Sequence, residues 1–554
     1  MKRNSLSFGL KLLAISTILL SLLAACGDNN AGGGAPVGGT HGGETQTEAQ
    51  AGTADAEESG REFFEFTMFM NYEWYDTSPV FGQDETSRYL LERFNTSLTL
   101  AKPDTDPDTM MNLMIAAGDL PDAIMLDRGA HYFTMAQNGM LFPLDDLINA
   151  GSNYARLLSA EVRESAKIDG VTYGILNWPT DETSPTGNNG VVLNTRIHDM
   201  LGNPPITTTE ELYEYLLMVQ QQVPELDGNP IIPMSAHGNF GDFHSFFGGL
   251  RGLSGQGVFL DNNEFRLIYH DPAFVDAIHF MNRLFNQDLI NRDILIETND
   301  QFLERLAIGR VAVFVGNMAE HIRPSRMRLR EIDPLADYTV IRPPAAPGLS
   351  QDEIWLDFFH TIGWNVLVIN NQTERPDRIF ELFDFLFSEE GTVVMYYGPR
   401  GFIWEETDAD GFPYLTTDVD ALSEQERNEL GLFIWSFPGN SVFANNMGNA
   451  ITARLPVEDW QWGELYHREF IWNHSRPMTE FAMLFNDLTL NDPNSEVAII
   501  RERYWNYNEE LLPRLITANS PSEIDTLIQQ AIDEVMAMNF QTYLDHINQL
   551  WINR

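Results

Sequence analysis

Cysteine is almost absent from this chain of 554 residues, which contains a single one, Cys26. The chain can therefore form no internal disulfide, and its stability has to come from burial of apolar surface. A hydrophobic content of 43% is ample for that purpose. The spacings typical of zinc ligands, glycine-rich phosphate loops and nucleophile elbows are also missing, so no common metal, nucleotide or acyl-transfer motif points to an activity.

Basic residues are few as well. The chain has 34 Lys and Arg against 80 Asp and Glu, which gives a formal net charge of −46. A surface this acidic repels anionic polymers, so we expect no nucleic-acid partner. A neutral or cationic ligand is easier to accept.

The N-terminal residues predict a cleavable leader. Its apolar run, Leu12–Leu23, is shorter than the roughly 20 residues that a membrane-spanning helix needs. The run follows basic residues and precedes Ala24, Ala25 and Cys26, which predicts a secretory signal peptide cleaved before the cysteine. This arrangement resembles the lipobox of bacterial lipoproteins, in which the cysteine is diacylated and becomes the new N-terminus. We therefore expect residues 1–25 to be a lipoprotein signal peptide and Cys26 to be lipidated.

The mature chain has two compositional parts. Loss of the three basic residues of the leader takes its formal net charge from −46 to −49. Residues 26–60 are rich in Gly, Ala, Thr and Glu and predict a flexible linker after the lipid. Residues 61–554 are too many for one hydrophobic core, so we expect at least two lobes.

The first part of the body predicts an α/β lobe. Apolar residues alternate over 64–70, as on a half-buried strand, and helices are expected over 85–94 and 109–117. Gly118 ends the second helix, and a short buried strand follows over 123–126. This order predicts a parallel sheet whose ligand site lies beyond the carboxyl ends of its strands.

A second α/β unit follows. A strand begins at Val191, and Thr207 or Thr208 caps a helix with a glutamate completing a capping box. Another helix begins at Asp271-Pro272, and residues 311–315 predict a further strand.

The rest of the chain is expected to complete both lobes. Residues 363–369 predict a strand, Pro376 opens a helix, and a helix capped by Ser520 lies near the end. We expect the first lobe to comprise 61–190 and 361–435, and the second to comprise 191–360 and the largely helical 436–554.

Several short motifs along the body carry a family resemblance. They occupy residues 118–122, 139–146, 169–174, 205–216, 285–293, 302–315 and 389–401. With the lipobox before them, the chain resembles the family 1 extracellular solute-binding proteins of ABC importers, in the large lipoprotein branch labelled LplA-type.

The resemblance implies a fold and a role. The fold is α/β, with two lobes, a hinge and an interlobe cleft, as in periplasmic binding proteins. The role is capture of a carbohydrate, here expected to be an oligosaccharide, for the permease subunits of an ABC transporter. The protein would be a monomer on the outer face of the cell membrane, held there by its lipid alone, with no cofactor and no enzymatic activity.

The chain departs from its relatives at two places. Some relatives have a calcium loop where this chain has Pro224–Pro230, which offers only Glu225, Asp227 and Asn229 as side-chain ligands. Calcium takes about six to eight oxygens, so we predict no metal there. Relatives often have an acid at the position of Arg400, so their substrates should not be transferred to this chain.

A sugar-binding cleft needs flat aromatic rings and a few planar polar groups. Tryptophans near expected strand ends or in loops supply the rings, and nearby charged or polar residues supply the polar groups. The candidate ligand-binding residues are Trp74, Asp127, Arg128, Trp178, His237, Asn239, Trp355, Trp364, Arg400, Trp404 and Trp435. For each tryptophan taken singly, packing in the core is the competing role.

Three other functions stay open. The same fold could bind peptides or another solute, or it could report to a sensor kinase. A glycosidase would need two carboxylates roughly 5 to 10 Å apart, and the adjacent Glu389 and Glu390 point in different directions from a helix end. Asp408–Gly411 resembles the start of a calcium-binding loop without its closing glutamate and is expected to be a turn.

Overall fold

The computed structural model describes residues 61–149, 151–181, 189–236, 252–253, 256–317, 321–334, 336–354, 357–359, 361–419, 422–455, 474–477, 481, 484–485 and 488–553. Four candidate residues lie outside this set: Cys26, His237, Asn239 and Trp355. The predictions for the leader and for residues 26–60 also fall outside it.

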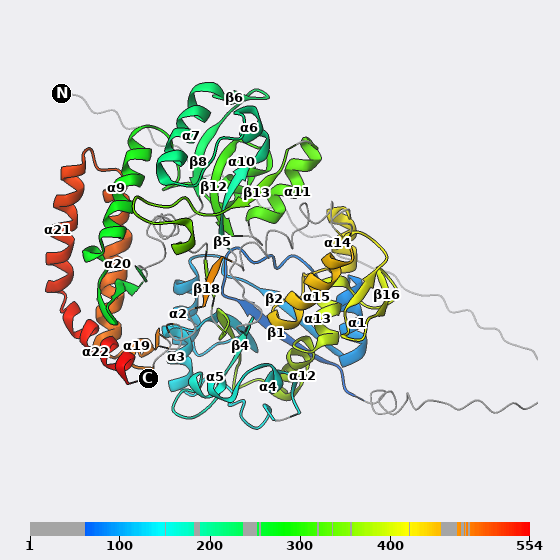
Figure 1. Ribbon diagram of the computed structural model, residues 1–554. Helices are drawn as coiled ribbons and strands as arrows, with labels where there is room; N and C mark the ends of the chain where they lie inside the picture. Colours follow the sequence, from blue (N-terminus) through cyan, green and yellow to red (C-terminus); the bar gives the residue numbers. More distant parts are fainter. Residues whose placement is uncertain are drawn as a thin grey trace, which may run out of the picture. The chain divides into compact units, whose positions relative to one another are not determined.

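The first sheet has five strands in the order β2–β1–β3–β15–β4 (Figure 1). Their bounds are β1 Phe64–Met70, β2 Thr96–Ala101, β3 Ala123–Asp127, β4 Gly174–Asn177 and β15 Asn365–Ile369. β1 pairs in parallel with β2 and β3, as expected, but β15 runs antiparallel to β3 and β4. The parallel pairing predicted for the first part of the body is therefore confirmed, whereas the antiparallel direction of β15 was not predicted. The reversal of β15 brings the residues before it to the edge where β1, β3 and β4 end.

Capping residues set where the helices beside this sheet begin and end. α1 (Glu85–Phe94) begins after Asp84, whose carboxylate accepts a hydrogen bond from the Ser87 amide, 2.8 Å. α2 (Pro107–Ala117) ends at Gly118, whose φ of 67° is easy for a glycine. Both helices lie where the sequence predicts them.

One hydrophobic cluster holds the five strands and the helices around them. α12 (Pro376–Leu386) contributes Ile379, Leu382 and Phe383, each fully buried. Helices α3 (Ala130–Gln137), α4 (Asn153–Leu157) and α5 (Ala160–Ser165) also contribute side chains to this cluster.

The second sheet has four strands in the order β13–β5–β12–β8. Their bounds are β5 Asn189–Asn194, β8 Ile232–Ala236, β12 Val311–Asn317 and β13 Tyr338–Ile341. Its core is filled from helices α7 Thr209–Gln222, α9 Pro272–Asn286, α10 Asn299–Ala307 and α11 Arg323–Ile332. α7 carries the predicted capping box between Thr208 and Glu211, and α9 begins at the predicted Asp271 cap. This α/β unit is the one that the sequence predicts.

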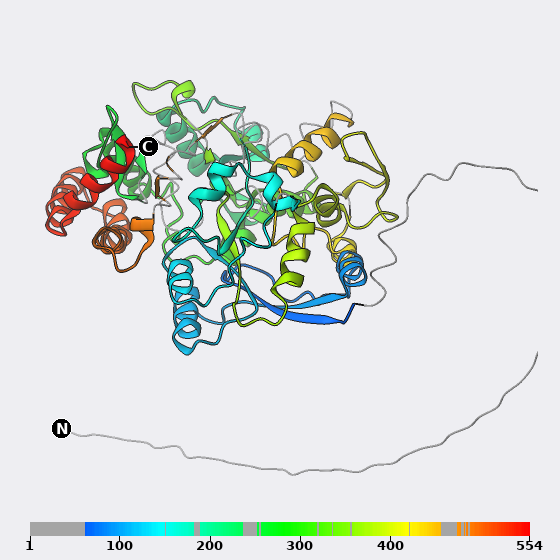
Figure 2. The ribbon, with the colours of Figure 1, turned by 90° about the horizontal axis from the view of Figure 1, so that it is seen from below.

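The C-terminal helices form a third cluster with α9 and a small hairpin. They are α20 Glu496–Ile516, α21 Pro521–Ala537 and α22 Phe540–Ile552, and the sheet beside them is β9 Gly252–Leu253, β10 Val258–Asp261 and β11 Glu264–Leu267. Both views show α20 beside α9 (Figures 1 and 2). Asn282 of α9 donates to the carbonyls of Ile516 and Ala518, so the two helices are joined by hydrogen bonds as well as by packing.

A fourth, smaller cluster surrounds Trp404. It joins α13 (Glu389–Tyr397), the hairpin of β16 (Trp404–Thr407) and β17 (Pro413–Leu415), and α15 (Ser441–Ala453). α15 packs with α13 and β17 in this cluster, while the assignment of residues 436–554 to the second lobe stays a prediction.

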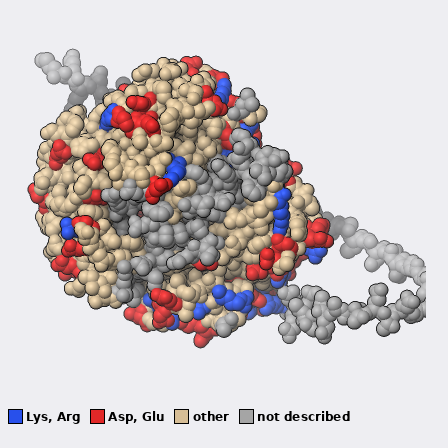
Figure 3. Space-filling view, in the orientation of Figure 1, with Lys and Arg blue, Asp and Glu red and all other residues tan. Residues whose placement is uncertain are grey.

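The other regular elements are short. They are α6 Thr195–Met200, α14 Glu424–Leu430, α19 Leu488–Asn491, β6 Glu225–Leu226, β7 Asn229–Pro230, β14 Asp357–Phe359 and β18 Ser475–Pro477. Within the described part of the chain, no helix is both long enough and apolar enough to cross a membrane. Acidic side chains are spread over the visible face, with basic ones between them (Figure 3).

Candidate functional site

Four aromatic rings gather where β1 ends. The Tyr72 ring lies 5.3 Å from Trp74 and 5.2 Å from Trp364, and Trp74 lies 5.8 Å from Tyr75 and 6.2 Å from Trp364, measured between ring centroids. Tyr72 is buried, whereas Trp74 is 55% and Trp364 41% exposed. Exposed indoles supported by a buried ring give an apolar surface open to solvent, in which the rings are tilted by 35° to 54° to one another. We call Tyr72, Trp74, Tyr75 and Trp364 the aromatic platform.

The direction of β15 explains the platform. Trp74 follows β1, but Trp364 precedes β15, and the two meet because β15 runs opposite to β3. Asn365, the first residue of β15, pairs with Asp127 of β3 on one side and with Asn177 of β4 on the other. The polar ends of three strands therefore lie side by side beneath the platform.

Asp127 is joined to the platform by a hydrogen bond. The Tyr72 hydroxyl donates to its carboxylate at 2.8 Å. Burial raises the pKa of Asp127, while the hydrogen bond from Tyr72 works in the opposite direction. Burial, followed by the nearby Asp127 charge, raises the pKa of Tyr72, which keeps the phenol a hydrogen-bond donor.

Arg128 acts on the protein's own backbone. Its guanidinium donates to the carbonyls of Ile362 at 2.6 Å and Gly363 at 2.7 Å. Burial lowers its pKa to about 10, so the group stays charged at neutral pH. Arg128 thus positions the loop that presents Trp364. Its Nε has no hydrogen-bond partner among the described residues, and a contact of Arg128 with ligand hydroxyls stays a prediction.

Buried amides complete the floor of this region. The Asn177 side-chain oxygen accepts hydrogen bonds from the backbone N–H groups of Trp178 and Gly439, both 2.9 Å. Asn365 is fully buried, and neither polar atom of its side chain has a hydrogen-bond partner among the described residues. Burying an amide without partners is costly, so this residue is unusual among the buried polar groups of the sheet.

Two further aromatic residues stand in strained backbone conformations. Trp178 has φ of 55° and Phe433 has φ of 63°, and their rings lie 6.1 Å apart. Bulky residues rarely adopt positive φ, and such strain is typical of functional sites. Phe433 was missed by the sequence analysis, because nothing in a sequence marks a phenylalanine for this conformation.

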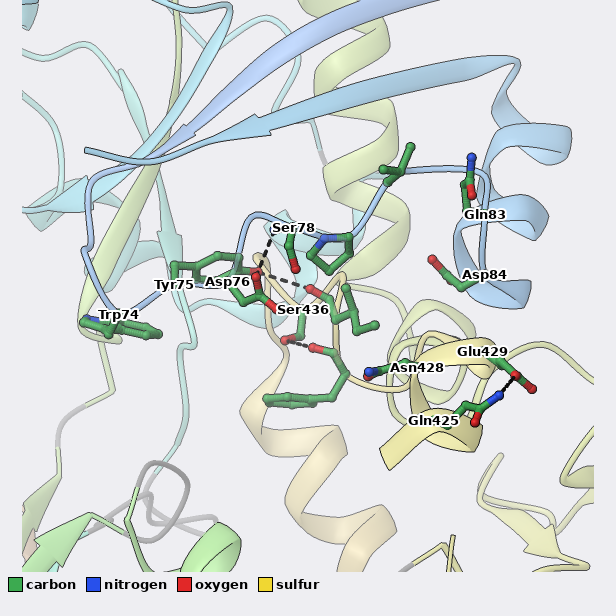
Figure 4. Close-up of a pocket in the computed structure, with 14 residues that line it drawn as sticks. Trp74, Tyr75, Asp76, Ser78, Gln83, Asp84, Gln425, Asn428, Glu429 and Ser436 are labelled. Carbon is green, nitrogen blue, oxygen red and sulfur yellow. Dashed lines mark hydrogen bonds between the residues drawn. The ribbon is translucent and has the colours of Figure 1, made fainter. Parts of the chain in front are cut away.

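A groove of about 850 Å³ adjoins the platform (Figure 4). Trp74 and Tyr75 lie at one end, and Gln425, Asn428 and Glu429 project from α14 across from Gln83 (Figure 4). The other lining residues are Asp76, Ser78, Pro79, Val80, Asp84, Phe433, Ile434 and Ser436. Apolar rings alternate here with amides, hydroxyls and carboxylates, which suits a ligand with both apolar faces and many hydroxyls.

Trp435 holds the wall of the groove in place. It is fully buried, and its indole N–H donates to Asp84 at 2.9 Å, while its ring meets Phe81 edge-on at 4.9 Å. The Thr86 hydroxyl donates to the Leu430 carbonyl nearby, 2.7 Å. Trp435 therefore docks the loop after α14 onto α1 and offers no ring face to a ligand, which corrects its place among the candidates.

Trp404 and Arg400 are not brought to the platform. Trp404 is buried in the fourth cluster, where its indole N–H donates to the Gly398 carbonyl at 2.9 Å, so it belongs to the core. Arg400 is exposed, and its guanidinium lies 3.9 Å from Glu405. Neither residue lines the groove.

The remaining polar candidates are structural where they can be seen. Asp227 pairs with Arg196 at 2.7 Å, and Glu390 accepts from the Tyr89 hydroxyl at 2.9 Å. The Asp408 carboxylate accepts the backbone N–H groups of Asp410 and Phe412, which makes the predicted turn. No group of three or more potential metal-ligating side chains occurs within the described residues.

Comparison with known proteins adds two curated relatives, while no protein-family model matches the chain. The chain is 22% identical over 326 residues to the polygalacturonan/rhamnogalacturonan-binding protein YtcQ of Bacillus subtilis, over 58% of this chain and 63% of that protein. It is 20% identical over 232 residues to lipoprotein LipO of the same organism, over 40% of this chain and 44% of that protein. The chain therefore spans less than two thirds of the length of each relative.

Solved structures of similar fold cover nearly all of the body. The Streptococcus pneumoniae ABC-transporter substrate-binding protein FusA, in complex with kestose, matches with a TM-score of 0.64 and 15% identity, over 88% of this chain and 99% of that one. A solute-binding protein from Bifidobacterium longum infantis, described as binding HMO, matches with a TM-score of 0.60 and 14% identity, over 89% and 99%. These matches confirm the two-lobed α/β fold class and the expected resemblance to ABC-transporter solute-binding proteins.

Proposed function

We propose that this chain is a lipid-anchored, extracytoplasmic solute-binding protein that captures an oligosaccharide and delivers it to the permease of an ABC transporter. The observation that carries the proposal is the aromatic platform beside the groove. Its two exposed indoles are held by the buried Tyr72 at the edge of the sheet where ligands of α/β proteins bind.

The platform matches the chemistry of a sugar. The C–H faces of a pyranose stack on indole rings, and its hydroxyls need planar partners such as the Gln83, Gln425 and Asn428 amides at the groove. A micromolar dissociation constant corresponds to a binding free energy of about −8 kcal/mol, which a few stacked rings and hydrogen bonds can supply. FusA is described in complex with kestose, and YtcQ as a polygalacturonan/rhamnogalacturonan-binding protein, which supports a saccharide as the ligand.

The proposed mechanism is hinge closure. A ligand that touches both lobes stabilises the closed form by the difference between its affinities for the closed and open forms. The closed form would then dock on the permease subunits. No step breaks a bond of the sugar, so the protein is a receptor and not an enzyme, in line with the binding proteins that it resembles.

A thermal-shift screen of the purified mature chain tests this function. Neutral and acidic oligosaccharides, peptides and amino acids are compared at equal concentration. We expect oligosaccharides to raise the melting temperature and to be recovered intact by chromatography. If only peptides raised the melting temperature, the protein would be a peptide-binding protein. If monosaccharides were released, it would be a glycosidase.

Lipid anchoring has its own test. We expect the full chain, expressed in a Gram-positive host, to incorporate labelled palmitate and to remain with the membrane. The variant Cys26→Ser lacks the thiol that accepts the lipid and should appear unlabelled in the medium. Membrane retention of this variant would show that something other than the lipid holds the protein.

A further inference from the structure

We infer that the groove selects uncharged oligosaccharides and excludes those built of uronic acids. This inference rests on the proposed function and specifies its substrate class. Three features support it. The charged side chains that line the groove are acidic, the neighbouring cations contact other groups of the protein, and the polar groups of the groove suit hydroxyls.

Every charged side chain among the described lining residues is acidic. Asp76 and Glu429 are exposed at the groove, and Asp84 lies buried in its wall. The Asp84 carboxylate accepts hydrogen bonds from Ser87 and Trp435 and forms no ion pair among the described residues. No Lys, Arg or His is found among the described residues that line the groove. A sugar carboxylate placed here would meet like charges in a partly desolvated space, which is unfavourable.

Cations near the groove already contact the protein itself, and Lys102, beside Trp74, donates to the Glu73 carbonyl. Arg128 donates to two backbone carbonyls, and Arg427 of α14 donates to the Leu422 carbonyl. Arg88 of α1 forms an ion pair with Glu85 at 2.6 Å and also donates to the Gln83 carbonyl. Turning any of these toward a ligand would break at least one of the contacts just named.

The exposed polar groups suit hydroxyls. Gln425 and Asn428 can donate and accept, while the Glu429 carboxylate, which already accepts from Gln425 at 2.7 Å, can only accept. A sugar hydroxyl can donate to such a carboxylate, whereas an ionised uronate has no proton to offer it. The pectic polymer named for YtcQ is acidic, so this groove predicts a different ligand from that of a relative only 22% identical.

Calorimetric titration of matched saccharides tests the inference. Neutral trisaccharides of glucose, galactose and mannose are compared with the same compounds after oxidation of their primary hydroxyls to carboxylates, and with the methyl esters of those acids. Oligogalacturonates and their methyl esters complete the set. We expect each acid to bind at least about tenfold more weakly than its neutral parent at low salt, and the ester to recover most of the loss.

Two double variants locate the source of the discrimination. Asp76→Asn with Glu429→Gln removes two charges at the groove and should reduce the discrimination several-fold. Asp199→Asn with Glu214→Gln removes the same charge from exposed positions on α6 and α7 and should leave it unchanged.

The outcomes separate the inference from the proposed function. An acid that binds as tightly as its ester, or an equal effect of both double variants, overturns the inference and leaves the proposed function standing. A folded protein that binds no saccharide at all overturns the proposed function, and the inference with it.

Discussion

At the scale of single residues, the ring of Trp178 lies where only a glycine leaves room. A Cβ atom at Gly439 would sit 2.1 Å from this ring, far inside van der Waals contact. The two residues are also joined through Asn177, which accepts hydrogen bonds from both backbones. The position of Trp178 next to Phe433 therefore depends on residue 439, which lies far away in the sequence.

A double-mutant cycle tests this dependence. Gly439→Ala should cost about 1–3 kcal/mol, because the ring has to move or the backbone has to shift. On a Trp178→Ala background the same substitution should cost much less, since the obstructing ring is gone. Urea unfolding of the four proteins gives the coupling energy, and additive costs would show that the ring does not set the requirement for glycine.

Asp127 predicts a pH dependence of stability. Because burial raises its folded-state pKa, the folded protein holds this proton more tightly than the unfolded chain does. Protonated Asp127 therefore stabilises the folded protein relative to its ionised form. This stabilisation is complete below about pH 3.9, the pKa of an aspartate in the unfolded chain, and it is lost as the pH rises through the higher pKa of Asp127 in the folded protein. Asp127→Asn does not titrate, so it should gain stability relative to the wild type between pH 3 and pH 7, by a few tenths of a kcal/mol or more.

Asp377→Asn provides the control of opposite sign. A hydrogen bond from Arg375 lowers the pKa of Asp377, so its contribution is present at neutral pH and lost as the pH falls. This variant should lose stability relative to the wild type over the same rise in pH. Urea unfolding at pH 3 and pH 7 gives the free energy of unfolding of each protein. If this free energy changed by the same amount in the wild type and in Asp127→Asn, the burial of Asp127 would be contradicted.

At the scale of elements, a buried ion pair joins α11 to β13. The Arg326 guanidinium holds the Asp337 carboxylate through two hydrogen bonds of 2.8 and 2.9 Å, and the side chains are only 7% and 5% exposed. Asp337 also accepts from the Tyr338 amide, at the start of β13. Removing one partner leaves a buried charge without its counter-ion.

Asp337→Ala should therefore lower the free energy of unfolding by about 3–5 kcal/mol, whereas replacing both partners by apolar residues, as in Arg326→Met with Asp337→Leu, should cost less. Asp377→Ala, which breaks an exposed pair with Arg375, should cost about 1 kcal/mol or less. Chemical denaturation compares the three variants. A small loss for Asp337→Ala would mean that solvent reaches the buried pair.

The elements also show what the sequence could predict. The helix starts at Thr208 and Asp271 and the end at Gly118 depend on side chains within a few residues, and the structure has them where they were expected. The direction of β15 and the packing of α15 on α13 depend on contacts between segments that are distant in the sequence, for which a single sequence contains no local pattern.

In the candidate site, too, local features could be predicted from the sequence and long-range contacts could not. Trp74 was predicted to follow a strand, and its exposure agrees with a role as a ring surface, although its contact with a ligand stays a prediction. Trp404 was also predicted to follow a strand or turn, and Trp435 to lie near a strand end or in a loop. Both are buried, because burial of a single tryptophan depends on the elements that cover it. Phe433 and Asn365 were missed because their importance lies in backbone strain and in the lack of hydrogen-bond partners.

At the scale of the whole molecule, strong acidity coexists with an apolar platform. The chain carries 80 acidic side chains, and acidic residues are spread over the described part of the face seen in Figure 3. Such a charge keeps the protein soluble and repels anionic polymers, whereas Trp74 and Trp364 remain exposed at one edge of the first sheet. The central claim is that these two rings are the surface on which a sugar stacks.

One calorimetric titration tests this claim most directly, using a neutral oligosaccharide selected by the thermal-shift screen. The double variant Trp74→Ala with Trp364→Ala should bind at least about a hundredfold more weakly than the wild type, since each stacked ring contributes about 1.4 kcal/mol or more. Trp505→Ala removes a tryptophan of α20 that is 44% exposed and should bind as the wild type does. Wild-type affinity in the double variant would contradict the account.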